Sequence, residues 1–155
     1  MRAYGPVALR WCIGAVFVAH GAQKLFGAWG GPGLNGTAAM LGSLGFSYPY
    51  PLAIVLAAAE LGGGVLLALG AGTRWVSLAL LVDMAVATWK VHYPNGFFLN
   101  WSLVRGHGHG IEYNLVLIGA LLCLMMTGAG ALSVDEWRSQ SAEARARGRA
   151  RARKV

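Results

Sequence analysis

The chain has 155 residues, which is room for one domain. Apolar residues make up 56% of it and charged residues only 12%, about half the charge that a soluble domain usually carries. Such a chain cannot cover a water-facing surface, which excludes an ordinary soluble domain and favours a surface that faces lipid. Its two cysteines are too few for a disulfide framework.

Four apolar stretches predict membrane-spanning helices, at about residues 9–26, 51–70, 75–91 and 111–130. Each approaches the ~20 residues that cross about 30 Å of hydrocarbon. Backbone polar groups in lipid must be satisfied within the segment, so these stretches are expected to be helical. The sequence therefore predicts an all-α fold, a four-helix transmembrane bundle, within a membrane domain of residues 1–137.

The first stretch has a rival interpretation as a cleaved signal peptide. Arg2 and Arg10 would form its charged region, residues 11–19 its apolar region, and cleavage would follow Gly21. Gln23 and Lys24 follow at once, and a discarded segment has no need of such polar residues. We therefore expect this helix to be retained.

The segments outside the spans differ in character. The first outer loop, residues 27–50, is rich in glycine and contains a predicted short interfacial helix at residues 37–44. The link at residues 71–74 is short, so the helices it joins should be antiparallel neighbours. Residues 138–155 predict a disordered basic tail, which anionic lipid attracts by about 1 kcal/mol per basic residue. We expect the tail to contact the bilayer and no nucleic acid.

Orientation follows from the distribution of Lys and Arg. With both termini in the cytoplasm, the inner side holds Arg2, Arg10, Arg74 and the seven cations of the tail. The outer side then holds three cations, and this asymmetry matches the positive-inside rule. The sequence predicts a multi-pass protein of a bacterial plasma membrane with the N- and C-termini cytoplasmic.

Ionisable residues inside the predicted spans are the candidate functional groups. A charge near the bilayer centre costs about 2.5–3.5 kcal/mol on insertion scales, so it is expected to be paired, neutralised or solvated. The sequence places several polar residues between the midplane and the outer boundary, where they would line an outward pocket. They are His20, Gln23, Lys24, Glu60, Asp83, Lys90 and Glu112. The alternative is a polar network that only fixes the order of the helices.

Two further motifs have competing interpretations. Gly62, Gly63 and Gly64 allow either close helix packing or the approach of a flat ring. His92, His107 and His109 are weak candidates for metal ligands, because flanking glycines leave the last two poorly preorganised and no carboxylate lies beside them. We expect close packing for the glycines and no metal at the histidines.

Several short motifs carry a family resemblance. They are Leu9-Arg10 and His20-Gly-Ala-Gln-Lys24-Leu-Phe-Gly27 on the first span, Glu60-Leu-Gly-Gly63 on the second, His92-Tyr-Pro-Asn-Gly-Phe-Phe98 before the last, and Glu112-Tyr-Asn-Leu115 opening it. In this order they resemble the DoxX family of small integral membrane proteins, over about residues 5–130. The resemblance implies a four-helix protein of bacterial and archaeal plasma membranes. Some members are linked to thiosulfate- or quinol-oxidising complexes or to secreted oxidant-detoxifying enzymes.

Three functions stay open on the sequence alone. The first is a redox-associated membrane subunit whose pocket binds a quinone-like molecule or relays protons, with electrons from a redox-protein partner. The chain has no haem, flavin or nucleotide motif to supply them. The second is a non-catalytic assembly factor that recruits a redox or oxidant-detoxifying enzyme. The third is a small-solute transporter, which a chain this short would form only as a homo-oligomer.

Overall fold

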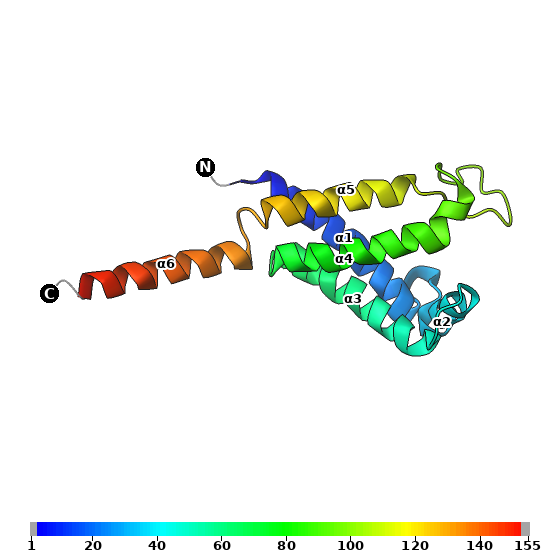
Figure 1. Cartoon of the computed structure of the whole chain (residues 1–155), viewed down its shortest axis with the longest axis horizontal. Helices are drawn as coiled ribbons and strands as arrows, with labels where there is room; N and C mark the ends of the chain where they lie inside the picture. The colour runs from blue at the N-terminus through cyan, green and yellow to red at the C-terminus, as the bar shows by residue number, and fades with distance from the viewer. Residues whose placement is uncertain (1–2, 153–155) are drawn as a thin grey trace.

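The computed structural model describes residues 3–152, and that part of the chain is helical with no strand. Its α-helices are α1 (Gly5–Phe26), α2 (Gly33–Ser43), α3 (Pro49–Leu69), α4 (Thr73–Ala87), α5 (Glu112–Thr127) and α6 (Val134–Ala152). Two 3-10 turns, η1 (Ala28–Gly30) and η3 (Tyr93–Asn95), and one π-helical turn, η2 (Thr88–His92), lie between them. In Figure 1, α2 lies at one end of the molecule and α6 leaves the other.

Three helical segments are long and apolar enough to cross a membrane: Gly5–Phe26, Pro49–Leu69 and Thr73–Asn95. The last combines α4 with η2 and η3. Helix α5 is apolar but has only 16 residues, a length of about 24 Å. It ends before the expected residue 130 because Gly128, with φ 79° and ψ −167°, lies outside the helical region.

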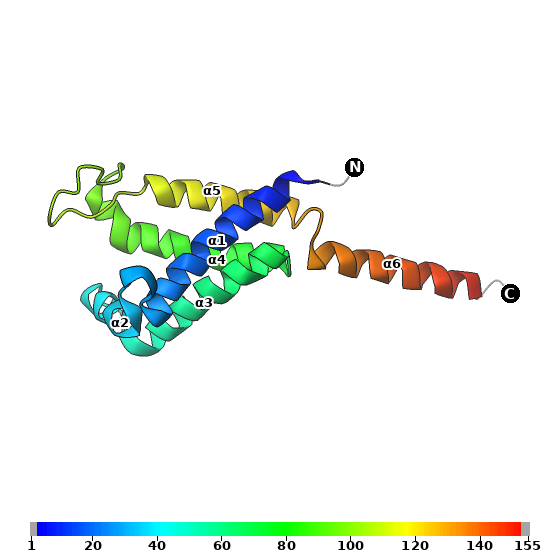
Figure 2. The ribbon, with the colours of Figure 1, turned by 180° about the vertical axis from the view of Figure 1, so that it is seen from behind.

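Helices α1, α3, α4 and α5 pack in a ring, with α1 on α3, α3 on α4, α4 on α5 and α5 on α1. Figures 1 and 2 show from both sides that α1 and α3 run obliquely to α4 and α5. The predicted short helix of the first loop is present as α2, which begins four residues earlier than expected and packs against α3 and α1.

Glycines set the close approach of α1 and α3. A Cβ atom on Gly64 would lie 2.6 Å from the backbone nitrogen of Val18, and one on Gly14 would lie 2.7 Å from the carbonyl oxygen of Gly64. Real side chains do not tolerate such distances, so both positions exclude a Cβ atom. The absence of these side chains lets the two backbones approach closely, as small residues do in membrane helices.

The apolar core lies between the four packed helices. Phe17 of α1, Leu67 of α3, Leu80 of α4 and Leu121 of α5 are each at most 1% exposed. The residues around them are also apolar, including Ile13, Met84, Leu117 and Leu124. This layer separates the polar groups at the α2 end of the bundle from those at the α6 end.

Helix α6 begins in a hydrogen-bonded cap on the α3–α4 turn. The Ser133 hydroxyl accepts the Glu136 N–H at 3.0 Å, and the Glu136 carboxylate accepts the Leu132 N–H at 3.1 Å. Asp135 accepts the N–H groups of Gly72 and Thr73 at 2.8 and 2.9 Å. These bonds resemble a capping box and fix the first turn of α6 on the bundle.

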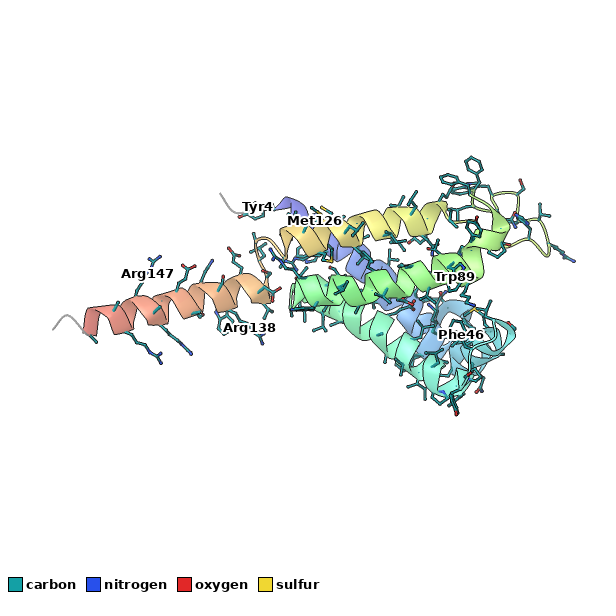
Figure 3. The ribbon with its side chains drawn as sticks, viewed as in Figure 1. Tyr4, Phe46, Trp89, Met126, Arg138 and Arg147 are labelled. Atoms are coloured by element: carbon teal, nitrogen blue, oxygen red, sulfur yellow. The ribbon has the colours of Figure 1, made fainter. Side chains whose placement is uncertain are left out.

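The rest of α6 differs from the disorder that the sequence predicts for residues 138–155. The chain is helical through Ala152, and Arg138 and Arg147 lie on opposite sides of the helix, which extends away from the bundle (Figure 3). Alanine and arginine both favour helices, and Glu143 and Arg147 form an ion pair at 3.7 Å one turn apart. Residues 153–155 of the expected tail lie outside the described part.

Candidate functional site

A buried ion pair joins α1 to α3. The Lys24 ammonium donates to both carboxylate oxygens of Glu60, each at 2.5 Å. The side chain of Glu60 is only 2% exposed and that of Lys24 is 20% exposed. The neighbouring Gly21 makes the pair possible, because a Cβ atom there would lie 2.4 Å from the backbone nitrogen of Leu61. Close helix packing thus brings a lysine and a glutamate together inside an apolar bundle.

Asp83 of α4 adds a second carboxyl group to this pair. The Asp83 carboxyl group lies close enough to Glu60 and Lys24 to interact electrostatically with both. Two neighbouring carboxylates repel each other, which favours a proton on one of them. The Oδ2 atom of Asp83 is buried without a hydrogen-bond partner. We call Lys24, Glu60 and Asp83 the carboxyl–lysine cluster.

His20 lies one helical turn from Lys24 at the edge of the cluster. It interacts electrostatically with both Lys24 and Glu60, yet the residue is exposed. An imidazole in this position connects the buried charges to the surface of the bundle. The imidazole can donate or accept a proton. Because the residue is exposed, it is also the accessible member of the group.

The structure does not bring Gln23, Lys90 or Glu112 into the carboxyl–lysine cluster. Gln23 packs against the backbone of Gly31. The Lys90 ammonium lies over two aromatic rings, 4.6 Å from the centroid of Trp89 and 5.8 Å from that of Phe46. Figure 3 shows Trp89 and Phe46 near each other at the α2 end of the molecule.

Glu112 is the first residue of α5, and its N–H donates to the Phe97 carbonyl at 2.9 Å. This position puts it at the loop end of α5, whereas Asp83 lies in the interior of α4. Of the residues that sequence depth assigns to an outward pocket, the structure brings Lys24, Glu60 and Asp83 together, with His20 beside them.

The three consecutive glycines of α3 have different surroundings. Gly64 faces α1 in the close contact already described. A Cβ atom on Gly63 would lie 3.1 Å from a methyl group of Leu80, so the absence of a side chain at Gly63 leaves room for the Leu80 side chain. A Cβ atom on Gly62 would meet no other atom within 4 Å. Two of the glycines therefore serve packing, and the third faces outward.

The loop histidines make hydrogen bonds within their own loop. His92 Nδ1 lies 2.9 Å from the His109 carbonyl oxygen, and His109 Nδ1 accepts the Asn100 N–H at 3.1 Å. The His107 carbonyl accepts from the Asn100 side chain at 2.8 Å. Among residues 3–152, no group of three or more His, Cys, Asp or Glu side chains is arranged to hold a metal ion.

Arg10 is a buried residue whose role the sequence did not reveal. Its guanidinium is 0% exposed and donates to the carbonyl oxygens of Ala129, Ala131, Leu132 and Ala68, the first two at 3.1 and 3.0 Å. These bonds tie α1 to the end of α3 and to the α5–α6 link. Helical periodicity is the feature of the sequence that indicates this burial. Arg10 lies one turn from Gly14 and two turns from Phe17, and both of these residues are buried.

Comparisons with known proteins agree with this helical membrane architecture. The family model described as DoxX matches residues 5–93, and the chain therefore belongs to the DoxX family, as the motifs indicated. A protein of Bacillus subtilis (strain 168) called "Putative oxidoreductase CatD" is 33% identical over 133 residues, which cover 84% of each chain. An uncharacterized protein of Haemophilus influenzae is 28% identical over 134 residues, 86% of this chain and 90% of that one. No solved structure matches the chain significantly.

Proposed function

We propose that this DoxX-family protein is a redox-associated subunit of the bacterial plasma membrane, in which the carboxyl–lysine cluster exchanges protons with a bound quinone-like molecule. The observation that carries the proposal is the contact of two carboxyl groups and one lysine inside an apolar bundle. Ionisable groups at such depth are costly and usually mark proton or substrate pathways. The name of the Bacillus relative supports redox chemistry.

The proposal includes four membrane crossings with both termini in the cytoplasm. Helices α1, α3 and α4 have the required length, and α5, though shorter, is apolar and packs between α4 and α1. Hydrophobic stretches shorter than the bilayer are accommodated by local thinning. The basic residues of α6 and the exposed Arg74 lie at one end of the molecule, as the positive-inside rule requires for a cytoplasmic face.

Reporter fusions test this topology. A reporter after Val155 or within the turn at Ala71 is expected to be cytoplasmic, and reporters inserted near Gly33 or Asn100 are expected to be external. Alkaline phosphatase and a fluorescent protein, compared at each site, give opposite signals for the two sides. An external C-terminus would contradict four crossings.

The proposed chemistry starts from one proton shared by Glu60 and Asp83. Reduction of a quinone to a quinol consumes two electrons and two protons. The electrons come from a redox-protein partner. The shared proton of the cluster passes through the exposed His20 to one quinone oxygen, and a second proton, taken up from water, passes to the other oxygen. Quinones dissolve in the bilayer, so the ligand reaches His20 from the lipid.

Binding of a short-chain benzoquinone tests the ligand. We expect saturable binding to the purified protein in mild detergent by isothermal titration calorimetry. Asp83→Asn and Glu60→Gln should weaken binding about tenfold each, because each alters one hydrogen bond of the cluster. Lys90→Met is the matched control, since it removes a cation outside the cluster and should bind normally. Equal binding by all variants, or none by the wild type, would count against the quinone.

The second candidate function is a non-catalytic assembly factor. The observation in its favour is the outer loop before α5, where Phe98, Trp101 and Leu103 are 71%, 77% and 77% exposed. An exposed apolar group of this kind is typical of a surface that contacts another protein or the membrane. The two functions differ in the cluster, because an assembly factor should tolerate Asp83→Asn and Glu60→Gln in cells, whereas a proton-exchanging subunit should not.

A further inference from the structure

Helix α5 is shorter than the helical segment that packs beside it. It has 16 residues, whereas the neighbouring segment Thr73–Asn95 has 23. The two are level at the α6 end, because a Cβ atom on Gly128 would lie 3.7 Å from the Arg74 side chain. At 1.5 Å per residue, α5 therefore stops about 10 Å short of Asn95. The loop of residues 96–111 occupies this depth, at the end of the molecule opposite α6 (Figure 1).

The first residues of this loop pair with the chain that enters α5. The Gly110 N–H donates to the Phe98 carbonyl at 3.0 Å, and the Glu112 N–H donates to the Phe97 carbonyl at 2.9 Å. A Cβ atom on Gly110 would lie 2.6 Å from the Phe98 carbonyl oxygen, so glycine is needed for this close approach. Phe97 and Phe98 therefore lie at the depth of the first turn of α5.

Two asparagines supply hydrogen bonds to the backbone of the same loop. The Asn100 side chain donates to the carbonyls of Val104 and His107 at 3.0 and 2.8 Å, and it accepts the Val104 N–H at 3.0 Å. The Asn95 side chain accepts the Gly108 N–H at 3.2 Å. A loop in water can bond to solvent, whereas backbone groups in lipid need internal partners of this kind.

The outward side chains of the loop are apolar and end at a cation. Phe98, Trp101 and Leu103, whose high exposure is given above, are followed by Val104, which is 58% exposed, and by the exposed Arg105. Leu103 has a φ of 49°, a left-handed conformation that is costly for leucine. A leucine held at such a cost with its side chain outside the protein indicates a contact that lies beyond the chain.

We propose that residues 97–104 are inserted into the outer leaflet of the bilayer, where they cover the outer end of α5 and complete the fourth crossing. Phe98, Trp101 and Leu103 lie among the outermost acyl carbons, and the Arg105 guanidinium lies at the level of the lipid phosphates. The inference rests on the four crossings of the proposed function and adds a lipid-binding surface to them.

Depth and charge favour lipid over a soluble protein as the partner of this loop. Phe97 and Phe98 are fixed beside the first turn of α5, and a soluble protein would reach only groups that stand clear of the headgroups. Aromatic side chains favour the boundary between acyl chains and headgroups. Arginine binds phosphate through its fork of N–H donors, so Arg105 matches the charge of the adjacent lipid layer.

Spin-label accessibility tests the depth of the loop. Cys12 and Cys123 are replaced by alanine in the full-length protein, and a nitroxide is attached to Leu103→Cys or, separately, to Phe98→Cys. In nanodiscs of phosphatidylethanolamine and phosphatidylglycerol, collisions of the label with oxygen and with a water-soluble nickel chelate are measured by electron paramagnetic resonance. Oxygen concentrates among acyl chains and the chelate in water, so we expect oxygen collisions to exceed chelate collisions severalfold at both positions.

Val116→Cys and Ala146→Cys supply the two reference environments. Val116 is 67% exposed on α5 and should face acyl chains, whereas Ala146 lies on the exposed part of α6 and should face water. A loop ratio of oxygen to chelate collisions closer to that of Val116→Cys supports insertion.

A ratio closer to that of Ala146→Cys would place the loop in water and overturn the inference, leaving its apolar side chains to a soluble partner. The measurement does not involve the carboxyl–lysine cluster, so its outcome is independent of quinone binding. A cytoplasmic signal from the reporter near Asn100 would instead overturn the four crossings of the proposed function, which the collision ratio does not detect.

Discussion

Glu60→Leu is expected to destabilise the folded protein by about 3–5 kcal/mol, because it leaves the half-buried ammonium of Lys24 without its counter-ion. The same change removes the carboxyl group beside Asp83, whose Oδ2 atom already lacks a hydrogen-bond partner. Glu60→Gln should cost less, since the amide still offers an oxygen to Lys24 and a hydrogen bond to Asp83. Reversible unfolding in mixed micelles, followed by circular dichroism, measures both variants.

A double variant separates the ion pair from simple packing. Lys24→Met combined with Glu60→Leu removes both charges at once, and replacing both members of a buried pair by apolar residues is often neutral. We expect the double variant to recover most of the stability that Glu60→Leu loses. If Glu60→Leu alone is as stable as Glu60→Gln, the pair is not buried as described, and the functional proposal loses its basis.

Arg10→Ala is expected to cost a similar amount, about 3–5 kcal/mol, because it leaves several buried carbonyl oxygens without a donor. The lost bonds connect three separate segments: α1, the end of α3 and the α5–α6 link. Arg10→Lys should recover only part of the loss, since one ammonium cannot reach the carbonyls that the guanidinium fork contacts. Thermal unfolding in detergent measures the effect.

Arg74→Ala is the matched control for Arg10→Ala. Arg74 is an exposed arginine at the same end of the molecule, so its removal should change stability by less than about 0.5 kcal/mol. Both changes remove one positive charge from the same side, and any effect on membrane orientation should therefore be shared. Equal and small effects of the two substitutions would mean that Arg10 does not anchor the α5–α6 link.

Hydropathy predicts the helices well because lipid imposes one simple rule on each span. The apolar stretches near residues 9–26 and 51–70 appear as α1 and α3 with ends moved by a few residues. The same reasoning does not give the side to which a polar residue points. The sequence predicts Arg10 to be a cytoplasmic cation. Its position on α1 instead directs the side chain into the protein, where it donates to backbone carbonyl oxygens.

The π-helical turn explains why Lys90 does not join Asp83. Seven residues separate the two, which in a regular α-helix places them on one face. Lys90 lies within the turn η2, over Thr88–His92, where the wider helical repeat departs from the regular α-helical phase of Asp83. Lys90 therefore faces Trp89 and Phe46. No pattern in the sequence marks this turn.

The sequence predicts contacts between helices only where an ionisable residue inside a span needs a partner. An unpaired charge in lipid is costly, so Glu60 and Asp83 are expected to have a cationic partner such as Lys24. The structure brings these three residues together. The glycines that permit the contact, Gly21 and Gly64, give no such signal alone. Their role depends on which backbone lies opposite, and that is a property of the folded bundle.

The infrared spectrum of the carboxyl groups tests the central claim most directly. If Glu60 and Asp83 share a proton beside Lys24, the wild-type protein at neutral pH shows a protonated-carboxyl C=O band. That band should disappear in Asp83→Asn and in Glu60→Gln and persist in Glu112→Gln, which changes an acid outside the cluster. A wild-type spectrum without the band, or a band unchanged by both cluster substitutions, would contradict the account.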